Sequence, residues 1–296
     1  MRKALAIRWP FAERERRVRL SRSRAGTFGI FLFMLLMGTF MLLPAVYSVV
    51  QAFKPIDEIF AFPPRFFVRN PTLENFKQVL LLADNLWVPF SRYIFNSLLI
   101  SVGGTFLYVM ISSLAAYPLA KAKFRGIGLI SALVVWTLLF NADVTAMPRY
   151  IVISKLGMIN TYWAVLLPAL SGTMGVFLIR QFIVSAIPDS TLEAARIDGA
   201  SEYLIFFRIV MPSAKAAWMT VVIFAFQTFW NLNPQSYIYS ENLKQLPAVL
   251  SSIAAGGIAR AGAASAVSVI LMIPPIFIFI LSQSSVVETM AHSGLK

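Results

Sequence analysis

Six long apolar runs alternate with short polar connections along this chain. They lie at about residues 27–52, 93–119, 127–147, 162–183, 217–237 and 263–283. Each run has roughly the 20 residues needed to cross the hydrocarbon core of a bilayer. Because lipid offers the backbone no hydrogen-bond partners, runs of this length form helices rather than open strands. The pattern therefore predicts an all-α integral membrane protein with six transmembrane helices.

The distribution of basic residues predicts the orientation of these spans. The first 24 residues hold nine Lys or Arg, and the apolar run that follows is longer than the roughly 7–15 residues of a signal-peptide core. We therefore expect a retained first span with a cytoplasmic N-terminus, and six spans return the C-terminus to the cytoplasm. On this topology 17 of the 26 basic residues lie inside, as the positive-inside rule requires.

The composition narrows the class of protein further. Hydrophobic residues make up 58% of the chain and charged residues 13%, which favours one membrane-embedded domain over two soluble ones. The absence of cysteine and the single histidine, His292, argue against thiol chemistry, histidine catalysis and a metal site. The net charge of +13 follows from the cytoplasmic flanks of the spans, so we expect a lipid bilayer and no nucleic acid as the partner.

The chain divides into four predicted regions. Residues 1–26 are a basic cytoplasmic segment, and 27–92 are the first span with an extracytoplasmic segment. Residues 93–283 are the main transmembrane domain, and 284–296 are a cytoplasmic tail. Within the main domain, residues 185–215 form the longest inside connection after the N-terminus.

That connection has the signals of a helix, a turn and a second helix. Ser190 and Glu193 have the spacing of a capping box. Gly199 can take the left-handed conformation that ends a helix. Ser201 then restarts a helix that we expect to finish before Pro212. An ordinary hairpin between two spans and a contact surface for another protein are both compatible with this pattern.

Polar side chains inside apolar runs are costly and often face an interior path. The residues of this kind are Asn96, Asn141, Asp143, Gln181, Gln227, Asn231 and Asn233. Asn141, Asp143, Gln227 and Asn231 are the candidates for a substrate path. Hydrogen bonds between packed helices are the alternative explanation for each of them.

At the hairpin the chain resembles a known family. Glu193, Ala194, Ala195, Asp198, Gly199, Ala200, Phe206, Ile209 and Pro212 resemble the EAA loop of permease subunits of binding-protein-dependent ABC importers. Residues 156–164 and the pair Trp230 and Asn231 resemble the carbohydrate, maltose-type second permease. After Asn231 the residues Leu232, Asn233, Pro234 and Gln235 depart from the family's usual apolar-aromatic run.

The resemblance implies the type I permease fold of these importers and a division of labour among subunits. The chain would be a multi-pass protein of the bacterial inner membrane and not an enzyme. It would pair with a sister permease as a heterodimer, with two ATPase subunits and with an extracytoplasmic solute-binding protein. ATP and Mg would be bound by the ATPase subunits. The residues that would couple to the ATPase are Glu193, Ala194, Ala195, Asp198, Gly199, Ala200 and Phe206.

The resemblance also suggests the cargo and further contacts. Residues 54–76 resemble permeases of uronic-acid oligosaccharides, and Arg149 or Arg260 could meet an acidic cargo on the outer face. Residues 240–262 correspond to the outer loop that probes the sugar site of the binding protein. A self-sufficient ion-coupled secondary transporter is the alternative function, although Asp143 is the one acidic residue proposed inside a span.

Overall fold

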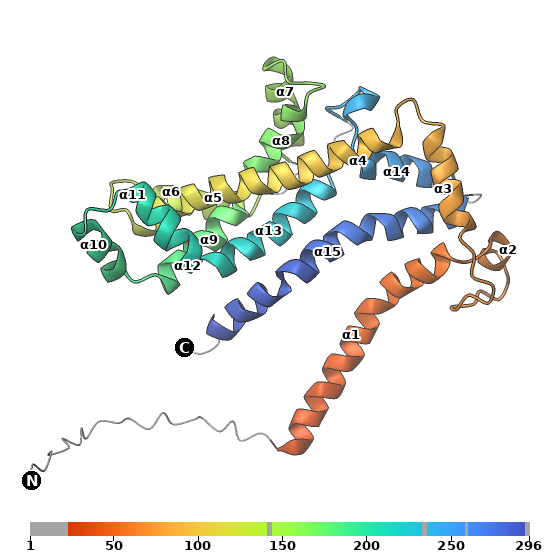
Figure 1. Ribbon diagram of the computed structural model, residues 1–296, viewed down its shortest axis with the longest axis horizontal. Coiled ribbons are helices and arrows are strands. Elements are labelled where there is room, and N and C mark those ends of the chain that lie inside the picture. Colours follow the sequence, from red (N-terminus) through yellow and green to blue (C-terminus); the bar gives the residue numbers. More distant parts are fainter. Residues whose placement is uncertain (1–22, 141–143, 233–235, 258–259, 294–296) are drawn as a thin grey trace, which may run out of the picture. The chain divides into compact units, whose positions relative to one another are not determined.

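A computed structural model describes residues 23–140, 144–232, 236–257 and 260–293 of the protein, without the side chains of 24–25 and 284–293. Every regular element among these residues is a helix, as the apolar pattern predicts (Figure 1). The chain forms two units, residues 1–47 and 48–296. The first unit holds most of helix α1 (Arg24–Ala52), and the second holds all the other elements.

The elements of the second unit follow one another with short connections. In chain order they are α2 (Ile56–Ile59), α3 (Glu74–Asp84), α4 (Phe90–Leu98), the π-helix η1 (Leu99–Gly103), α5 (Gly104–Lys121), α6 (Ile127–Thr137), α7 (Ala146–Lys155), α8 (Tyr162–Leu170), α9 (Met174–Ala186), α10 (Asp189–Ile197), α11 (Glu202–Ile205), the π-helix η2 (Phe206–Val210), α12 (Met211–Ser213), α13 (Lys215–Trp230), the 3-10 helix η3 (Glu241–Leu243), α14 (Leu246–Ala254) and α15 (Ala261–Ser293).

Four helical segments of the described chain are long and apolar enough to cross a membrane. They are Gly26–Ala52, Phe90–Lys121, Tyr162–Ala186 and Ala261–Gln283. A fifth exists if Glu202–Ser213 and Lys215–Trp230, which meet at an angle of 79°, form one broken span. The protein is therefore a multi-pass membrane protein, whereas the six-span count and the cytoplasmic placement of both termini stay predictions.

The expected span at 127–147 differs most from the structure. Helix α6 ends at Thr137 after 11 residues, and α7 begins only at Ala146. Eleven residues rise about 16 Å, roughly half of the hydrocarbon thickness. The expected span at 217–237 is shorter as well, because α13 ends at Trp230 after 16 residues. The apolar composition identified these segments but did not indicate where their backbone leaves the helix.

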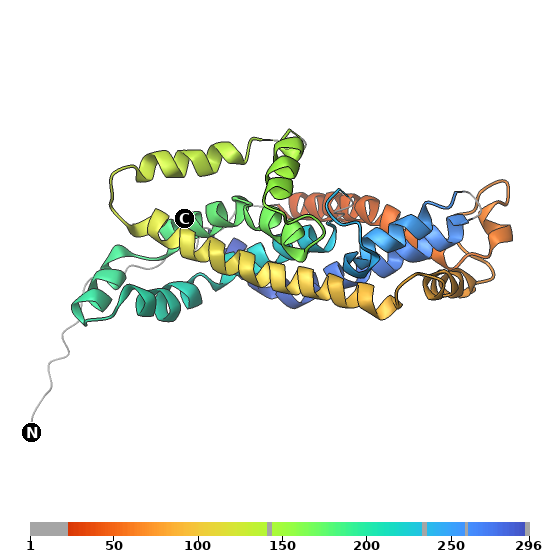
Figure 2. The ribbon, with the colours of Figure 1, turned by 90° about the horizontal axis from the view of Figure 1, so that it is seen from above.

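Two hydrophobic cores lie along the continuous helix from α4 through α5. One is built mainly by α5, α9 and α13, with Tyr108, Ile179 and Phe229 among its buried members. The other core lies near α4, where α3, α14 and the first part of α15 gather around Tyr93. Helices α10 and α11 lie at the other end of the continuous helix, beside the last residues of α5 (Figures 1 and 2). The unit thus has a hairpin end, a middle and a third part around Tyr93, which we call the outer end after the predicted topology.

Close packing in the middle depends on a glycine. A Cβ at Gly104 would lie 2.7 Å from the buried ring of Phe229. The absence of that atom lets α13 approach α5 closely enough to bury the aromatic ring. This contact helps to form the wall of the cavity described below.

Candidate functional site

The connection 185–215 is a helical hairpin, as its sequence predicts. Gly199 has φ of +80°, the left-handed conformation expected for the turn. Ser201 caps the second helix, since its hydroxyl accepts a hydrogen bond from the Leu204 N–H at 3.3 Å. The predicted cap at Ser190 is wrong, because α10 begins at Asp189 after Pro188 and has no side-chain cap. Proline there already presets the backbone angle for the first turn.

The second helix of the hairpin does not finish before Pro212, contrary to the prediction. It passes through the π-helix η2 and includes Pro212 in the last turn, α12. In an α-helix the proline ring collides with the carbonyl four residues earlier. The wider π turn just before Pro212 relieves that collision, so the helix bends at Ala214 instead of ending at residue 211.

One ion pair ties the start of the hairpin to the end of α5. The Lys121 ammonium donates to the Ile187 carbonyl and to the Asp189 carboxylate, each at 2.6 Å. Lys121 is largely buried and Asp189 is exposed. The hydrogen bond from Lys121, together with its charge, lowers the pKa of Asp189. Asp189 therefore stays ionised at neutral pH, and the contact holds the first arm in place.

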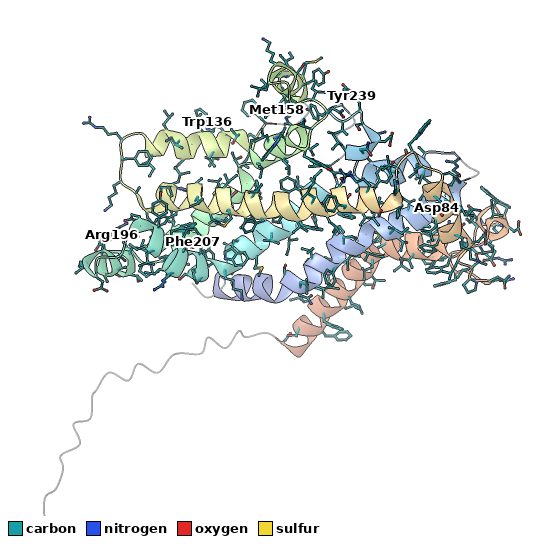
Figure 3. The ribbon with its side chains drawn as sticks, turned by 45° about the horizontal axis from the view of Figure 1, so that its top comes forward. Asp84, Trp136, Met158, Arg196, Phe207 and Tyr239 are labelled. Carbon is teal, nitrogen blue, oxygen red and sulfur yellow. The ribbon has the colours of Figure 1, made fainter. Side chains whose placement is uncertain are left out.

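A second link joins both arms of the hairpin to α5. Glu202 accepts hydrogen bonds from the Tyr117 hydroxyl and from the Arg196 guanidinium, each at 2.7 Å. The Phe206 ring packs against Tyr117 with centroids 6.0 Å apart. Figure 3 shows Arg196 and Phe207 at this end of the molecule. Tyr117 and Lys121 thus fix both arms of the hairpin to α5.

The predicted coupling residues divide by exposure. Glu193, Ala194, Asp198 and Gly199 are exposed, Ala195 and Ala200 are half-buried, and Phe206 is only 2% exposed. The Phe206 ring is thus packed inside this protein and does not form part of the exposed hairpin surface. The exposed apolar side chains of the hairpin are instead Tyr203, Ile197 and Phe207, of which Tyr203 is 76% exposed. Sequence reasoning missed Tyr117 and Lys121, since nothing in one sequence links α5 to the hairpin.

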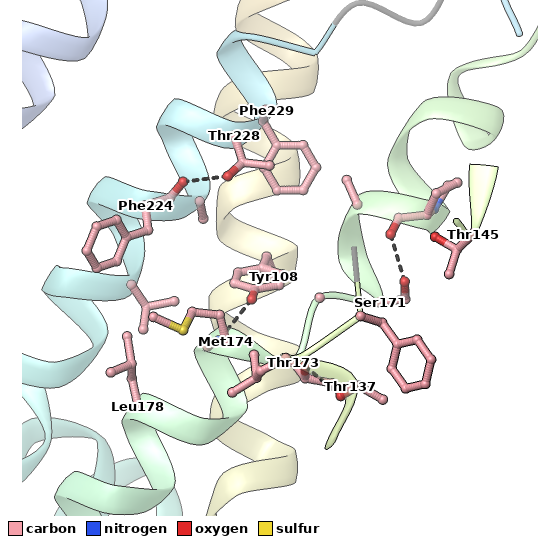
Figure 4. A pocket seen from close by; sticks show the side chains of 18 of the residues that line it. Tyr108, Thr137, Thr145, Ser171, Thr173, Met174, Leu178, Phe224, Thr228 and Phe229 are labelled. Carbon is pink, nitrogen blue, oxygen red and sulfur yellow. Dashed lines mark hydrogen bonds between the residues drawn. The ribbon is translucent and has the colours of Figure 1, made fainter. Parts of the chain in front are cut away.

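A cavity of about 710 Å³ opens in the middle of the molecule, beside the break between α8 and α9 (Figure 4). The expected span at 162–183 is interrupted here, because α8 ends at Leu170 and α9 begins at Met174. The Tyr108 hydroxyl accepts a hydrogen bond from the Gly175 N–H at 2.9 Å, and Thr137 and Thr173 pair through their hydroxyls at 2.9 Å. Polar backbone at membrane depth is tolerated where it lines such a cavity.

The lining combines aromatic rings, hydroxyls and one strongly basic side chain. Phe140, Phe224 and Phe229 contribute rings, and Ser171 and Thr228 add hydroxyls to those already named. Arg149 is the single Lys or Arg among the described lining residues, and one of its nitrogens donates to Thr145 at 2.9 Å. The cavity therefore suits a hydroxyl-rich ligand and favours a negative charge near Arg149.

The predicted path residues lie elsewhere or outside the described chain. Asn141 and Asp143 fall outside the described residues. Gln227 and Asn231 are exposed on α13, where the Asn231 amide donates to the Gln227 carbonyl at 2.9 Å. Neither lines the cavity, although helical spacing places Asn231 on the face of Thr228. The Ser-Gly-Thr sequence 171–173, inside an apolar run, was the available signal for the cavity.

Known proteins share this sequence and fold. The chain is 31% identical over 275 residues to the probable ABC transporter permease protein YurM of Bacillus subtilis, over 90% of this chain and 87% of the relative. It is 28% identical over 228 residues to the polygalacturonan/rhamnogalacturonan transport system permease protein YtcP of the same species, over 74% and 73%. The crystal structure of a bacterial ABC transporter involved in the import of the acidic polysaccharide alginate matches with a TM-score of 0.74 at 21% identity, covering 89% of this chain and 98% of that chain. No family model matches.

Apolar helices around a central cavity are the arrangement of a membrane transport protein, and these relatives are transport permeases. The chain belongs to the ABC transporter permease family, in its carbohydrate-transport branch. This confirms the resemblance read from the hairpin. It does not favour the alternative of a self-sufficient ion-coupled transporter.

Proposed function

We propose that this chain is one permease subunit of an ATP-driven importer of acidic, uronate-containing oligosaccharides in the bacterial inner membrane. It pairs with a sister permease, two ATPase subunits and an extracytoplasmic binding protein that delivers the cargo. The observation that carries the proposal is the cavity beside the α8–α9 break, with rings, hydroxyls and one guanidinium on its wall.

The cavity chemistry supports a saccharide. Its volume lies within the roughly 300–1,000 Å³ of small-ligand sites, which are mostly apolar with a few placed polar groups. Flat aromatic faces such as Phe224 pack against the apolar face of a sugar ring. Hydroxyls such as those of Thr137 and Thr173 exchange hydrogen bonds with sugar hydroxyls.

Two features favour an acidic sugar over a neutral one. Arg149 presents a planar donor fork that matches a carboxylate. Thr173, which precedes α9, and its first residues Met174 and Gly175 line the same cavity, and the N-terminal end of a helix carries partial positive charge. YtcP and the structurally similar alginate importer are named for acidic polysaccharides, which is consistent with this choice.

Energy for transport comes from the partner ATPases. The sequence holds no G-x-x-x-x-G-K-[ST] phosphate cradle, so ATP and Mg are bound by those subunits. The exposed hairpin surface, including Glu193 and Tyr203, docks into an ATPase cleft. Lys121 and Tyr117 carry its displacement into α5, and the cavity wall moves with that helix.

Charge removal in the cavity tests the cargo. We would purify the complete complex in lipid and measure ATPase stimulation by the loaded binding protein, with oligogalacturonides or arabino-oligosaccharides as cargo. Arg149→Gln removes a charge-assisted hydrogen bond worth about 1.5–3 kcal/mol, a loss of roughly 10–100-fold in kcat/KM for the acidic cargo. Arg149→Lys should lose less, and the neutral cargo should change less than about twofold.

Arg125→Gln is the matched control, because Arg125 is an exposed arginine in the connection between α5 and α6 and does not line the cavity. It should leave both cargoes unaffected. An equal loss for acidic and neutral cargo in Arg149→Gln would contradict the acidic preference. Transport by the permease pair without ATPase subunits would contradict the importer itself.

A further inference from the structure

A second cavity, of about 520 Å³, lies at the outer end of the molecule, apart from the one in the middle. Its wall comes from the connection before α4, the segment around η3 and one face of α14. The chemically distinctive residues that line it are Trp87, Tyr239, Glu241, Lys244, Gln245 and Ser252. It thus combines two aromatic rings with an acid, a base, an amide and a hydroxyl.

Gln245 carries hydrogen-bonding capacity that the protein does not use. The residue is fully buried, and neither its amide nitrogen nor its amide oxygen has a hydrogen-bond partner. It precedes α14 but does not cap that helix. A buried amide left unsatisfied is costly, and such groups commonly have a functional reason. An amide that can both donate and accept suits a sugar hydroxyl, which does the same.

Large aromatic side chains stand open to solvent beside this amide. Trp87 is 93% exposed, and Tyr239 is exposed on the opposite part of the wall. From Tyr239 the aromatic surface continues to Tyr237, whose ring stacks on Tyr150 with centroids 6.1 Å apart. Tyr150 directly follows Arg149, which lines the membrane cavity. A tyrosine series therefore runs from the outer cavity toward the inner one.

Buried polar groups of α4 hold the outer cavity in shape. The Asn96 amide donates to the carbonyls of Asn242 and Lys244 at 2.8 and 2.9 Å. The Ser97 hydroxyl accepts from the Leu246 N–H at 2.7 Å. On the other side the Asn160 side chain accepts from the N–H groups next to Tyr239, at 3.2 and 2.9 Å. The aromatic and charged side chains thus project from a fixed backbone, as a binding site requires.

We propose that the outer cavity is a second saccharide subsite, which holds one sugar unit of an oligosaccharide while another unit occupies the membrane cavity. This rests on the oligosaccharide cargo proposed above. Trp87 and Tyr239 pack on the sugar faces, and Gln245 and Ser252 bond its hydroxyls, while Lys244 is already paired with Glu241. The consequence is a dependence on chain length, since only a cargo of several units reaches both cavities.

Trp87→Ala tests the subsite through that dependence. We would measure equilibrium binding of oligogalacturonides of two and about five units to the complete complex in lipid nanodiscs, without binding protein. The variant should weaken the longer ligand about five- to tenfold and leave the disaccharide within about twofold. Trp163→Ala is the matched control, because Trp163 is another exposed tryptophan and lines neither cavity.

Gln245→Met separates a binding role from a structural one. Methionine has a similar volume and no polar group to leave unsatisfied, so the variant should raise the Tm of the complex while it weakens the longer ligand. Gln181→Met on the exposed face of α9 should change neither. A lower Tm together with unchanged binding would make Gln245 a structural residue and overturn its assignment.

Two outcomes distinguish this inference from the cargo proposal. If the unsubstituted complex binds both oligomers but Trp87→Ala weakens them equally or not at all, the subsite fails and the cargo stands. If Trp87→Ala leaves both oligomers unaffected and, in a separate assay with binding protein, weakens the association of that protein, the surface is a protein interface and the subsite is overturned. If neither oligomer binds or is transported, the cargo and the subsite fail together.

Discussion

Gly199→Val is the substitution that most directly tests whether the hairpin couples the permease to its ATPase. Gly199 has φ of +80°, and a Cβ at this position would meet no atom within 4 Å. Steric collision therefore contributes nothing, and the cost is that of a β-branched residue in the left-handed region, about 1–2 kcal/mol. A turn that relaxes to escape this strain redirects α11, so the Arg196–Glu202 contact and the link to Tyr117 are lost together.

That cost corresponds to a roughly 5–30-fold shift in the local equilibrium. We therefore expect binding-protein-stimulated ATP hydrolysis to fall several-fold or more, with unchanged membrane insertion and subunit assembly. Gly199→Asn is the graded control, because asparagine tolerates this conformation better than valine. The assay is stimulated ATPase activity of purified complexes, after co-purification has confirmed the subunit ratio. Full stimulation by a well-folded Gly199→Val complex would refute the coupling role of the hairpin.

Two further substitutions test the packing and the outer segment. Gly104→Ala places a Cβ 2.7 Å from the buried Phe229 ring. The substitution should destabilise the permease by about 1–3 kcal/mol, measured as a lower Tm. An unchanged Tm would mean that α5 and α13 can separate freely. The Glu58 carboxylate accepts the N–H groups of Arg69 and Asn70 at 3.0 and 2.9 Å, and these bonds lower its pKa below the ordinary 4.5, the one from Arg69 contributing most. The stabilisation is therefore present above pH 4.5 and lost as pH falls through the lowered pKa. Hydrogen exchange at both amides, corrected for its intrinsic pH dependence, should accelerate in that acidic range. In Glu58→Gln the exchange should already be faster at pH 7.

Local signals in the sequence predicted the hairpin well. Gly199 and Ser201 act through their own backbone and nearest neighbours, so their roles can be read without tertiary structure. The same reasoning failed at Pro212, because the relief comes from a π turn whose formation depends on burial of Phe206 against α5. Local chemistry was sufficient at Gly199 and Ser201 but not at Ser190, where Pro188 takes the N-cap position.

The apolar segments were easier to predict from the sequence than the points at which their helices break. Hydropathy integrates composition over some 20 residues, so it identified the apolar segments that contain α6, α8 and α9. It does not register that the backbone leaves the helix after Thr137 or between Leu170 and Met174. Those breaks are stable because a cavity and the Tyr108 hydroxyl accept the freed polar groups, and this depends on segments distant in sequence.

Asn96 shows the same limit for single polar residues. Its sequence context suggested either a substrate path or a helix contact, and the structure shows that it holds the backbone around η3. The partner carbonyls lie 146 and 148 residues further along the chain. Only the folded arrangement of α4 against α14 brings them together.

That separation in sequence also sets an order of events during synthesis. Asn96 enters the membrane with its segment well before the ribosome has made Asn242, since at roughly 5–20 residues per second about 150 residues take on the order of 10–30 seconds. Through this interval the amide has neither of its final partners. Its position in the first two turns of the continuous apolar helix Phe90–Lys121 keeps it within reach of headgroup water while it waits. The outer end of the permease is therefore among the last parts to mature, and a nascent chain halted before residue 242 would present an open outer end to quality-control proteases.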